Sequence, residues 1–91
     1  MTVRVNIHHY LFRDAAGPWV ITETNGKTLG ECLGQTVAKF PRLKNEVFDP
    51  AGKLQGHVLV FLNGEDASPD ELTRKVSDGD VVEMIPIIGG G

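Results

Sequence analysis

The 91-residue sequence has a single cysteine, no long apolar run and no excess of basic residues. One cysteine excludes an internal disulfide and is typical of a reducing compartment. A membrane-spanning helix needs about 20 consecutive apolar residues, and without such a run we expect no association with membranes. Nine Lys and Arg stand against twelve Asp and Glu, for a net charge of −3. These cations are scattered along the sequence, which predicts no surface for nucleic acid.

The beginning of the sequence also lacks the features of a signal peptide. Its first five residues, Met1-Thr2-Val3-Arg4-Val5, alternate polar and apolar side chains instead of forming an apolar block. A hydrophobic content of 41% is that of a soluble globule, and the length suffices for one modest core. We therefore expect a single-domain cytoplasmic protein.

Several short stretches have the composition of β-strands. Valine and isoleucine alternate with polar residues in 3–7, which indicates a strand with one wet face, and a turn at 15–18 makes it half of a hairpin. The strands are expected at 3–7, around 19–23, at 58–62 and at 81–85, with a shorter one at Val47-Phe48. Turns are expected at 49–52, 63–64 and 78–80, where Asp, Asn, Pro and Gly gather.

Two segments carry helix signals. Thr28 and Glu31 form a capping box, in which each side chain accepts a hydrogen bond from a backbone amide. Behind it an apolar stripe at helical spacing ends at Pro41 and comprises Leu29, Cys32, Leu33, Thr36, Val37 and Phe40. Cys32 lies in this stripe, so we interpret it as a core residue and not as a nucleophile. The sequence Ser68-Pro69 predicts a second, short helix through Lys75.

The order of elements is strand, strand, helix, strand, short helix, strand. One long helix across one face of a sheet buries the helix stripe and the inward strand residues. With strands at both ends of the chain, we expect the first and last to lie side by side and parallel in the centre of the sheet. The sequence thus predicts an α+β fold of the β-grasp type, with a mixed sheet of four to five strands.

The end of the sequence is its most distinctive part. An apolar strand meets Pro86, and Gly89, Gly90 and Gly91 close the chain. Over nearly its whole length, the chain resembles the ubiquitin-like sulfur carriers of the MoaD/ThiS family. The resemblance is carried by Thr28-Leu29, by the segment 60–65 (Val-Phe-Leu-Asn-Gly-Glu), and by the spacing from Asp78-Gly79-Asp80 to the terminal diglycine. The segment 48–54 is more similar to CysO-like members of this family.

The resemblance implies a carrier and not an enzyme. An E1-like adenylyltransferase would use ATP to adenylate the carboxylate of Gly91, which a sulfur donor then converts to a thiocarboxylate. A sulfur-accepting synthase would take the sulfur for molybdopterin or cysteine biosynthesis. No cofactor would be bound by the carrier itself. The alternatives left open are a ubiquitin-like modifier conjugated through Gly91, and an interaction domain whose glycine tail is an inert, frayed end.

We expect a globular domain over 1–86 and a flexible tail over 87–91. Pro86 has no amide donor and tends to end a ladder of strand hydrogen bonds. From there to Gly91 an extended chain spans on the order of 20 Å, and glycines allow it to enter a narrow channel. The residues expected to enter the partner are Ile87, Ile88, Gly89 and Gly90.

Strand periodicity predicts an apolar patch on the uncovered sheet face. If Val58, Val60 and Leu62 face the helix, then Leu59 and Phe61 face away, and Ile85 does so in the last strand. Exposed apolar patches mark interfaces, so we expect these three residues to bind a partner. The alternatives are a loop that folds over the patch and a homodimer interface.

The three histidines, His8, His9 and His57, have no Cys or carboxylate at ligand spacing, so no metal site is predicted. The adjacent His8 and His9 are expected on opposite faces of the sheet.

Overall fold

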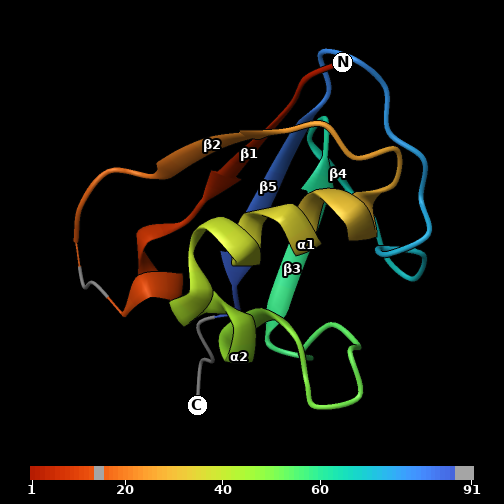
Figure 1. Cartoon of the computed structure of the whole chain (residues 1–91). Coiled ribbons are helices and arrows are strands. Elements are labelled where there is room, and N and C mark those ends of the chain that lie inside the picture. The colour runs from red at the N-terminus through yellow and green to blue at the C-terminus, as the bar shows by residue number, and fades with distance from the viewer. Residues whose placement is uncertain (14–15, 88–91) are drawn as a thin grey trace.

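The computed structural model describes residues 1–13 and 16–87. Helix α1 lies across one face of a five-stranded mixed sheet (Figure 1). The strands are β1 (Val3–Ile7), β2 (Val20–Thr24), β3 (Val58–Leu62), β4 (Glu65–Asp66) and β5 (Val81–Pro86), in the spatial order β2-β1-β5-β3-β4. The terminal strands β1 and β5 pair in parallel, and the other pairs are antiparallel. This confirms the expected α+β arrangement and the central position of the first and last strands.

The strand register places one set of side chains under the helix. Val5 lies opposite Val82 in the β1–β5 pair, and Val60 lies opposite Met84 in the β3–β5 pair. All four are at most 1% exposed. Their alternation with less buried neighbours is the period of two that a sheet with one covered face requires.

Helix α1 (Leu29–Lys39) begins as its capping residues predict. The Thr28 hydroxyl accepts from the Glu31 amide at 3.2 Å. The Glu31 carboxylate accepts from the amide of Lys27, one residue before the cap, at 2.8 Å. The predicted stripe faces the sheet, with Leu29, Cys32, Leu33 and Thr36 fully buried. Cys32 is thus a core residue, as expected.

The strand expected at Val47-Phe48 is wrong. Val47 ends a short helix, α2 (Lys44–Val47), which follows the 3₁₀ helix η2 (Pro41–Leu43). Leu43 and Val47 are four residues apart and both fully buried, a helical spacing that two neighbouring residues of strand composition concealed. Only Phe48 is extended, and it forms an isolated bridge with Leu54.

The helix expected through Lys75 is also wrong. The segment forms one turn, in which the Asp70 carbonyl accepts from the amides of Thr73 and Arg74. The next carbonyls point elsewhere: those of Leu72 and Arg74 accept from the amides of Gly30 and Leu29 at 2.9 and 2.8 Å. The segment therefore satisfies the free amides at the start of α1, and its own helix would remove those acceptors.

The turns at 49–52, 63–64 and 78–80 are confirmed. Asn63 and Gly64 both have positive φ, 51° and 84°, the combination of a tight hairpin turn. That hairpin returns as the two-residue strand β4, which the sequence did not predict.

The expected orientation of His8 and His9 is wrong as well. Strand β1 ends at Ile7, and His9 begins a 3₁₀ helix, η1 (His9–Phe12). The two imidazole rings therefore stack, with centroids 4.2 Å apart, instead of pointing to opposite faces.

Candidate functional site

The site is built around the point where the chain leaves β5. Pro86 is the last residue of β5 and lies opposite Val58. One further hydrogen bond follows, in which the Ile87 amide donates to the His57 carbonyl at 2.7 Å. Ile87 is the first residue of the predicted tail, and it is 49% exposed. The other residues of the predicted tail, Ile88, Gly89, Gly90 and Gly91, lie outside the described residues.

The three residues of the predicted partner surface lie together beside this exit. Leu59 and Ile85 are directly opposite each other across the β3–β5 pair, and Phe61 is opposite Glu83. All three are partly buried. They alternate with the buried Val58, Val60 and Met84, so they lie on the opposite face of the sheet from those core residues. We call Leu59, Phe61 and Ile85 the apolar patch. Its role in binding stays a prediction.

Sequence reasoning missed that aromatic residues continue this face toward β2. His8 and Trp19 lie just beyond the last β1–β2 pair, in which Ile7 is opposite Val20. Their ring centroids are 5.2 Å apart, in an edge-to-face arrangement. The His8 amide donates to the Met84 carbonyl at 3.0 Å, which places His8 next to Ile85. Trp19 is 37% exposed. The hairpin register could have revealed this pairing, since it aligns residues 8 and 19.

The imidazole of His8 accepts a hydrogen bond, and its environment favours the neutral form. Its Nδ1 accepts from the Tyr10 amide at 3.1 Å and so caps η1. Burial, and to a lesser extent the nearby charge of His9, lower the pKa of His8 below its ordinary value. At neutral pH this ring therefore adds an uncharged, aromatic surface beside the patch.

A cavity of about 350 Å³ adjoins the end of β5 at Pro86 and Ile87. Its lining combines apolar and charged side chains, from Tyr10, Leu11, Arg13, Glu46, His57, Pro86 and Ile87. Glu46 contacts two side chains of this lining: Arg13 Nη2 lies 2.5 Å from its Oε1, and His57 Nε2 lies 3.6 Å from its Oε2. Three chain segments thus meet beside the first residue of the tail. We call this space the exit cavity.

Arg13 lines this cavity, and two more cations lie on chain segments connected to its lining. Arg42 donates to the Phe12 carbonyl at 3.0 Å and stands over the ring of Phe12, the residue that precedes Arg13 in the chain. Lys44 begins α2, the helix that carries Glu46. Arg13, Arg42 and Lys44 are all exposed, and we call them the basic cluster. These three cations belong to η1, η2 and α2 or their caps, which come together only in the fold.

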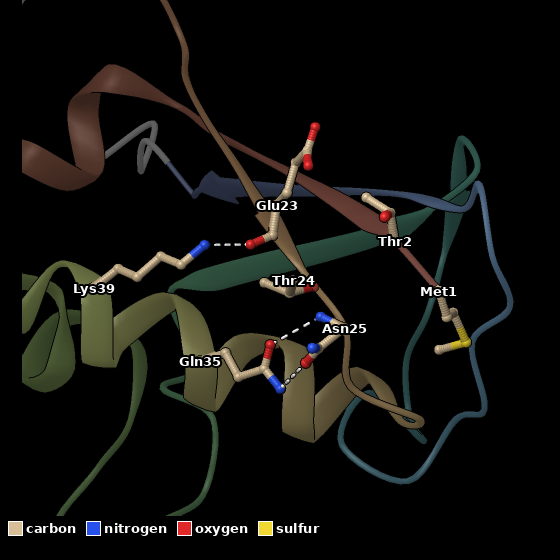
Figure 2. Close-up of a pocket in the computed structure, with 7 residues that line it drawn as sticks. All are labelled: Met1, Thr2, Glu23, Thr24, Asn25, Gln35 and Lys39. Atoms are coloured by element: carbon tan, nitrogen blue, oxygen red, sulfur yellow. Dashed lines mark hydrogen bonds between the residues drawn. The ribbon is translucent and has the colours of Figure 1, made fainter.

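A second cavity, of about 300 Å³, lies between α1 and the open edge of β2 (Figure 2). The side-chain amides of Asn25 and Gln35 are joined at 2.9 Å, and Gln35 also accepts from the Asn25 backbone amide at 2.9 Å. Lys39 Nζ donates to the Glu23 carbonyl and to the Thr22 hydroxyl. These polar groups are already paired with one another, so we interpret this cavity as part of the attachment of α1 to the sheet.

The described residues do not assemble a metal site. Within 1–13 and 16–87 no three His, Cys, Asp or Glu side chains gather in a way that could hold a metal ion. Among the same residues, no helix is both long and apolar enough to cross a membrane. The apolar patch and the exit cavity both adjoin the end of β5.

Comparison with known proteins places the chain in a family. The profile of the ThiS family matches residues 12–91. The sulfur carrier protein CysO of Mycobacterium tuberculosis is 31% identical over 94 residues, which cover all of both chains. The crystal structure of SAMP1 from Haloferax volcanii superposes with a TM-score of 0.80 at 28% identity over all of both chains. The structure of the Amycolatopsis orientalis BexX/CysO complex gives 0.80 at 27% identity, over 98% of this chain and 99% of that one. The chain therefore belongs to the ThiS family and has the β-grasp fold of these ubiquitin-like proteins.

Proposed function

We propose that this protein is a sulfur carrier whose working group is the carboxylate of Gly91. The observation that carries the proposal is similarity over the full length to a sulfur carrier protein, CysO, together with a family match that extends to the last glycine. The partner enzymes would then bind the β-grasp domain, and the chain that leaves β5 would carry the sulfur. We propose no catalytic role for the described residues, since Cys32 is buried and His8 serves a structural contact.

The chemistry follows from the state of a terminal carboxyl. Its pKa is about 3.3–3.7, so at neutral pH it is an anion and a poor electrophile. An E1-like adenylyltransferase would let a carboxylate oxygen attack the α-phosphate of ATP, with pyrophosphate as the leaving group. A sulfide-level donor then attacks the carbonyl carbon and displaces AMP. The product is a thiocarboxylate, whose sulfur is the nucleophile in the next reaction.

Two protein partners are part of the proposal, the adenylyltransferase and a sulfur-accepting synthase. The CysO of Amycolatopsis orientalis, a structural relative at 27% identity, forms a complex with BexX. By analogy, the apolar patch of this chain would contact the enzyme that takes the tail. We propose cysteine biosynthesis as the destination of the sulfur, on the strength of the similarity to CysO, with molybdopterin biosynthesis as the alternative.

A second candidate function is conjugation to other proteins. It is favoured by the similarity to SAMP1, a small archaeal modifier protein, at the same TM-score and 28% identity. The same adenylated Gly91 would then acylate a lysine amine instead of receiving sulfur. Both functions need the terminal carboxyl, and they differ in the nucleophile that attacks it.

Intact-mass spectrometry separates these functions. The full chain is incubated with ATP, a sulfide source and the E1-like adenylyltransferase of the same organism. A carrier gains the mass difference between sulfur and oxygen, whereas a modifier appears covalently bound to other proteins when a lysate is added. A chain without Gly91 is the control and should show neither product. Sulfur transfer that persists without Gly91, or a wild-type chain that forms neither product, would overturn the proposal.

A further inference from the structure

Charge is distributed unevenly along the long axis of the fold. The segment 65–80 contains six acidic residues and only two cations. It lies at the end of the sheet where Met1 lies (Figure 1), and Asp78 accepts there from the Thr2 amide at 2.7 Å. In the basic cluster, Arg13 lines the exit cavity together with Pro86 and Ile87, and Lys44 begins α2, the helix that contributes Glu46 to the same lining. A protein of net charge −3 thus presents a cation next to the end of β5.

The basic cluster keeps most of its charge and donors available. Glu46 neutralises one cation, Arg13, through its Oε1. A guanidinium has five N–H donors, and Arg13, whose side chain is 80% exposed, uses two of its nitrogens on Glu46. Arg42 donates to a neutral carbonyl and forms no ion pair among the residues that the structure describes. Lys44 makes no side-chain hydrogen bond or ion pair with the residues that the structure describes.

The exit cavity adds some apolar surface to these charges. Tyr10 and Ile87, 44% and 49% exposed, line it together with the buried Leu11. Large apolar side chains that remain exposed around a cavity indicate a binding surface. The cavity shares Pro86 and Ile87 with the root of the tail. A molecule bound here would therefore touch the tail where it leaves the domain.

We propose that the exit cavity and the basic cluster form a second docking surface for the adenylyltransferase that takes the tail. The segment that docks is acidic: an apolar side chain enters the cavity beside Ile87, and neighbouring carboxylates meet Arg13, Arg42 and Lys44. This inference rests on the proposed function and specifies the kind of segment with which the adenylyltransferase would dock. The apolar patch and the exit cavity then hold the end of β5 from two sides, which orients the tail toward the reaction centre.

An acidic protein segment fits this surface better than nucleic acid does. Stable binding to nucleic acid commonly neutralises about six to ten phosphates, and the basic cluster supplies three cations in a chain with a net negative charge. Charges at the rim of a protein interface act mainly on the rate of association and on its dependence on salt. The proposal therefore predicts an effect of ionic strength on KM and not on kcat.

Steady-state kinetics of adenylation, with the full chain as substrate and the E1-like enzyme of the same organism, test the proposal. Lys44→Glu reverses one charge of the basic cluster, and Lys75→Glu is the matched control, because Lys75 is also exposed but lies in the acidic half of the fold. Lys44→Gln removes the charge without reversing it. Circular dichroism and thermal unfolding verify that each variant is folded.

At low salt we expect Lys44→Glu to raise KM roughly fivefold or more, Lys44→Gln to raise it less, and Lys75→Glu to leave it within about twofold. The difference in KM between Lys44→Glu and the wild-type chain should shrink as the salt concentration is raised to physiological strength and beyond. Equal effects of Lys44→Glu and Lys75→Glu, or an effect confined to kcat, would overturn the second docking surface while leaving the carrier function intact. A wild-type chain that is not adenylated at all would overturn both.

Discussion

The amide of Gly30 donates to the carbonyl of Leu72 at 2.9 Å, and a Cβ added to Gly30 would lie 2.6 Å from that same oxygen. The start of α1 is thus pressed against the chain segment that leads into β5. Its first two amides are satisfied by that segment and not by water. Glycine at position 30 is required by this close approach, although glycine weakens a helix in general.

Two glycines of the same helix should therefore respond in opposite ways to alanine. A Cβ added to Gly34 would have nothing within 4 Å, so Gly34→Ala should stabilise the protein by about 0.5–1 kcal/mol through helix propensity. Gly30→Ala should destabilise it by about 1–3 kcal/mol, because the Leu72 carbonyl has to move. Urea denaturation of both variants measures the two effects. If Gly30→Ala were as stable as Gly34→Ala, the contact with Leu72 would be less close than described.

The same contact shows what the sequence could and could not reveal about the fold. Strands with strict alternation and the helix from Leu29 were predictable, because their periods depend only on which face is buried. The segment after Pro69 carries local signals of a helix start, but its carbonyls are needed by Gly30 and Leu29, some forty residues earlier in the chain. A requirement of this kind is tertiary, and no local pattern records it.

The candidate site was predictable to the same limited extent. Leu59, Phe61 and Ile85 follow from the period of two once the helix is assigned to one face. The exit cavity and the basic cluster do not, because Arg13, Arg42 and Glu46 belong to η1, η2 and α2 or their caps, and none of these was predicted as a helix. A 3₁₀ or single-turn helix is too short to show a periodicity.

Stability should fall on mild acidification because of His8. Its pKa is lowered by burial and by His9, so the unfolded chain binds a proton more readily than the folded one. The contribution to stability is then present above the unfolded pKa of about 6.5 and is lost as the pH falls through that value toward the folded pKa. Protonation of Nδ1 also removes the acceptor for the Tyr10 amide, a hydrogen bond of about 1 kcal/mol.

Chemical denaturation between pH 7.5 and 5.5 measures this effect. His8→Gln keeps an acceptor and cannot titrate in this range, so it should flatten the dependence on pH. His57→Gln is the matched control: His57 lies 3.6 Å from Glu46, and its loss should not remove a destabilisation by acid. A wild-type protein that is equally stable at both pH values contradicts the neutral role assigned to His8.

The apolar patch leads to the final prediction. Phe61 lies opposite Glu83 on β5 and opposite Asp66 on β4, so Phe61→Asp places a third carboxylate among these and removes the largest apolar side chain of the patch. We expect kcat/KM for adenylation of Gly91 to fall by at least about tenfold, a loss of about 1.4 kcal/mol, as truncation of a central interface residue does.

Like charges on neighbouring strands also weaken a sheet, so Phe61→Asp is tested together with Leu59→Ser, which adds no charge and should lower kcat/KM as well. Ala38→Asp is the control: Ala38 is exposed and belongs to α1, which covers the other face of the sheet. If folded Phe61→Asp and Leu59→Ser chains were adenylated as well as the Ala38→Asp chain, the partner would have to bind the protein by its tail and the exit cavity alone.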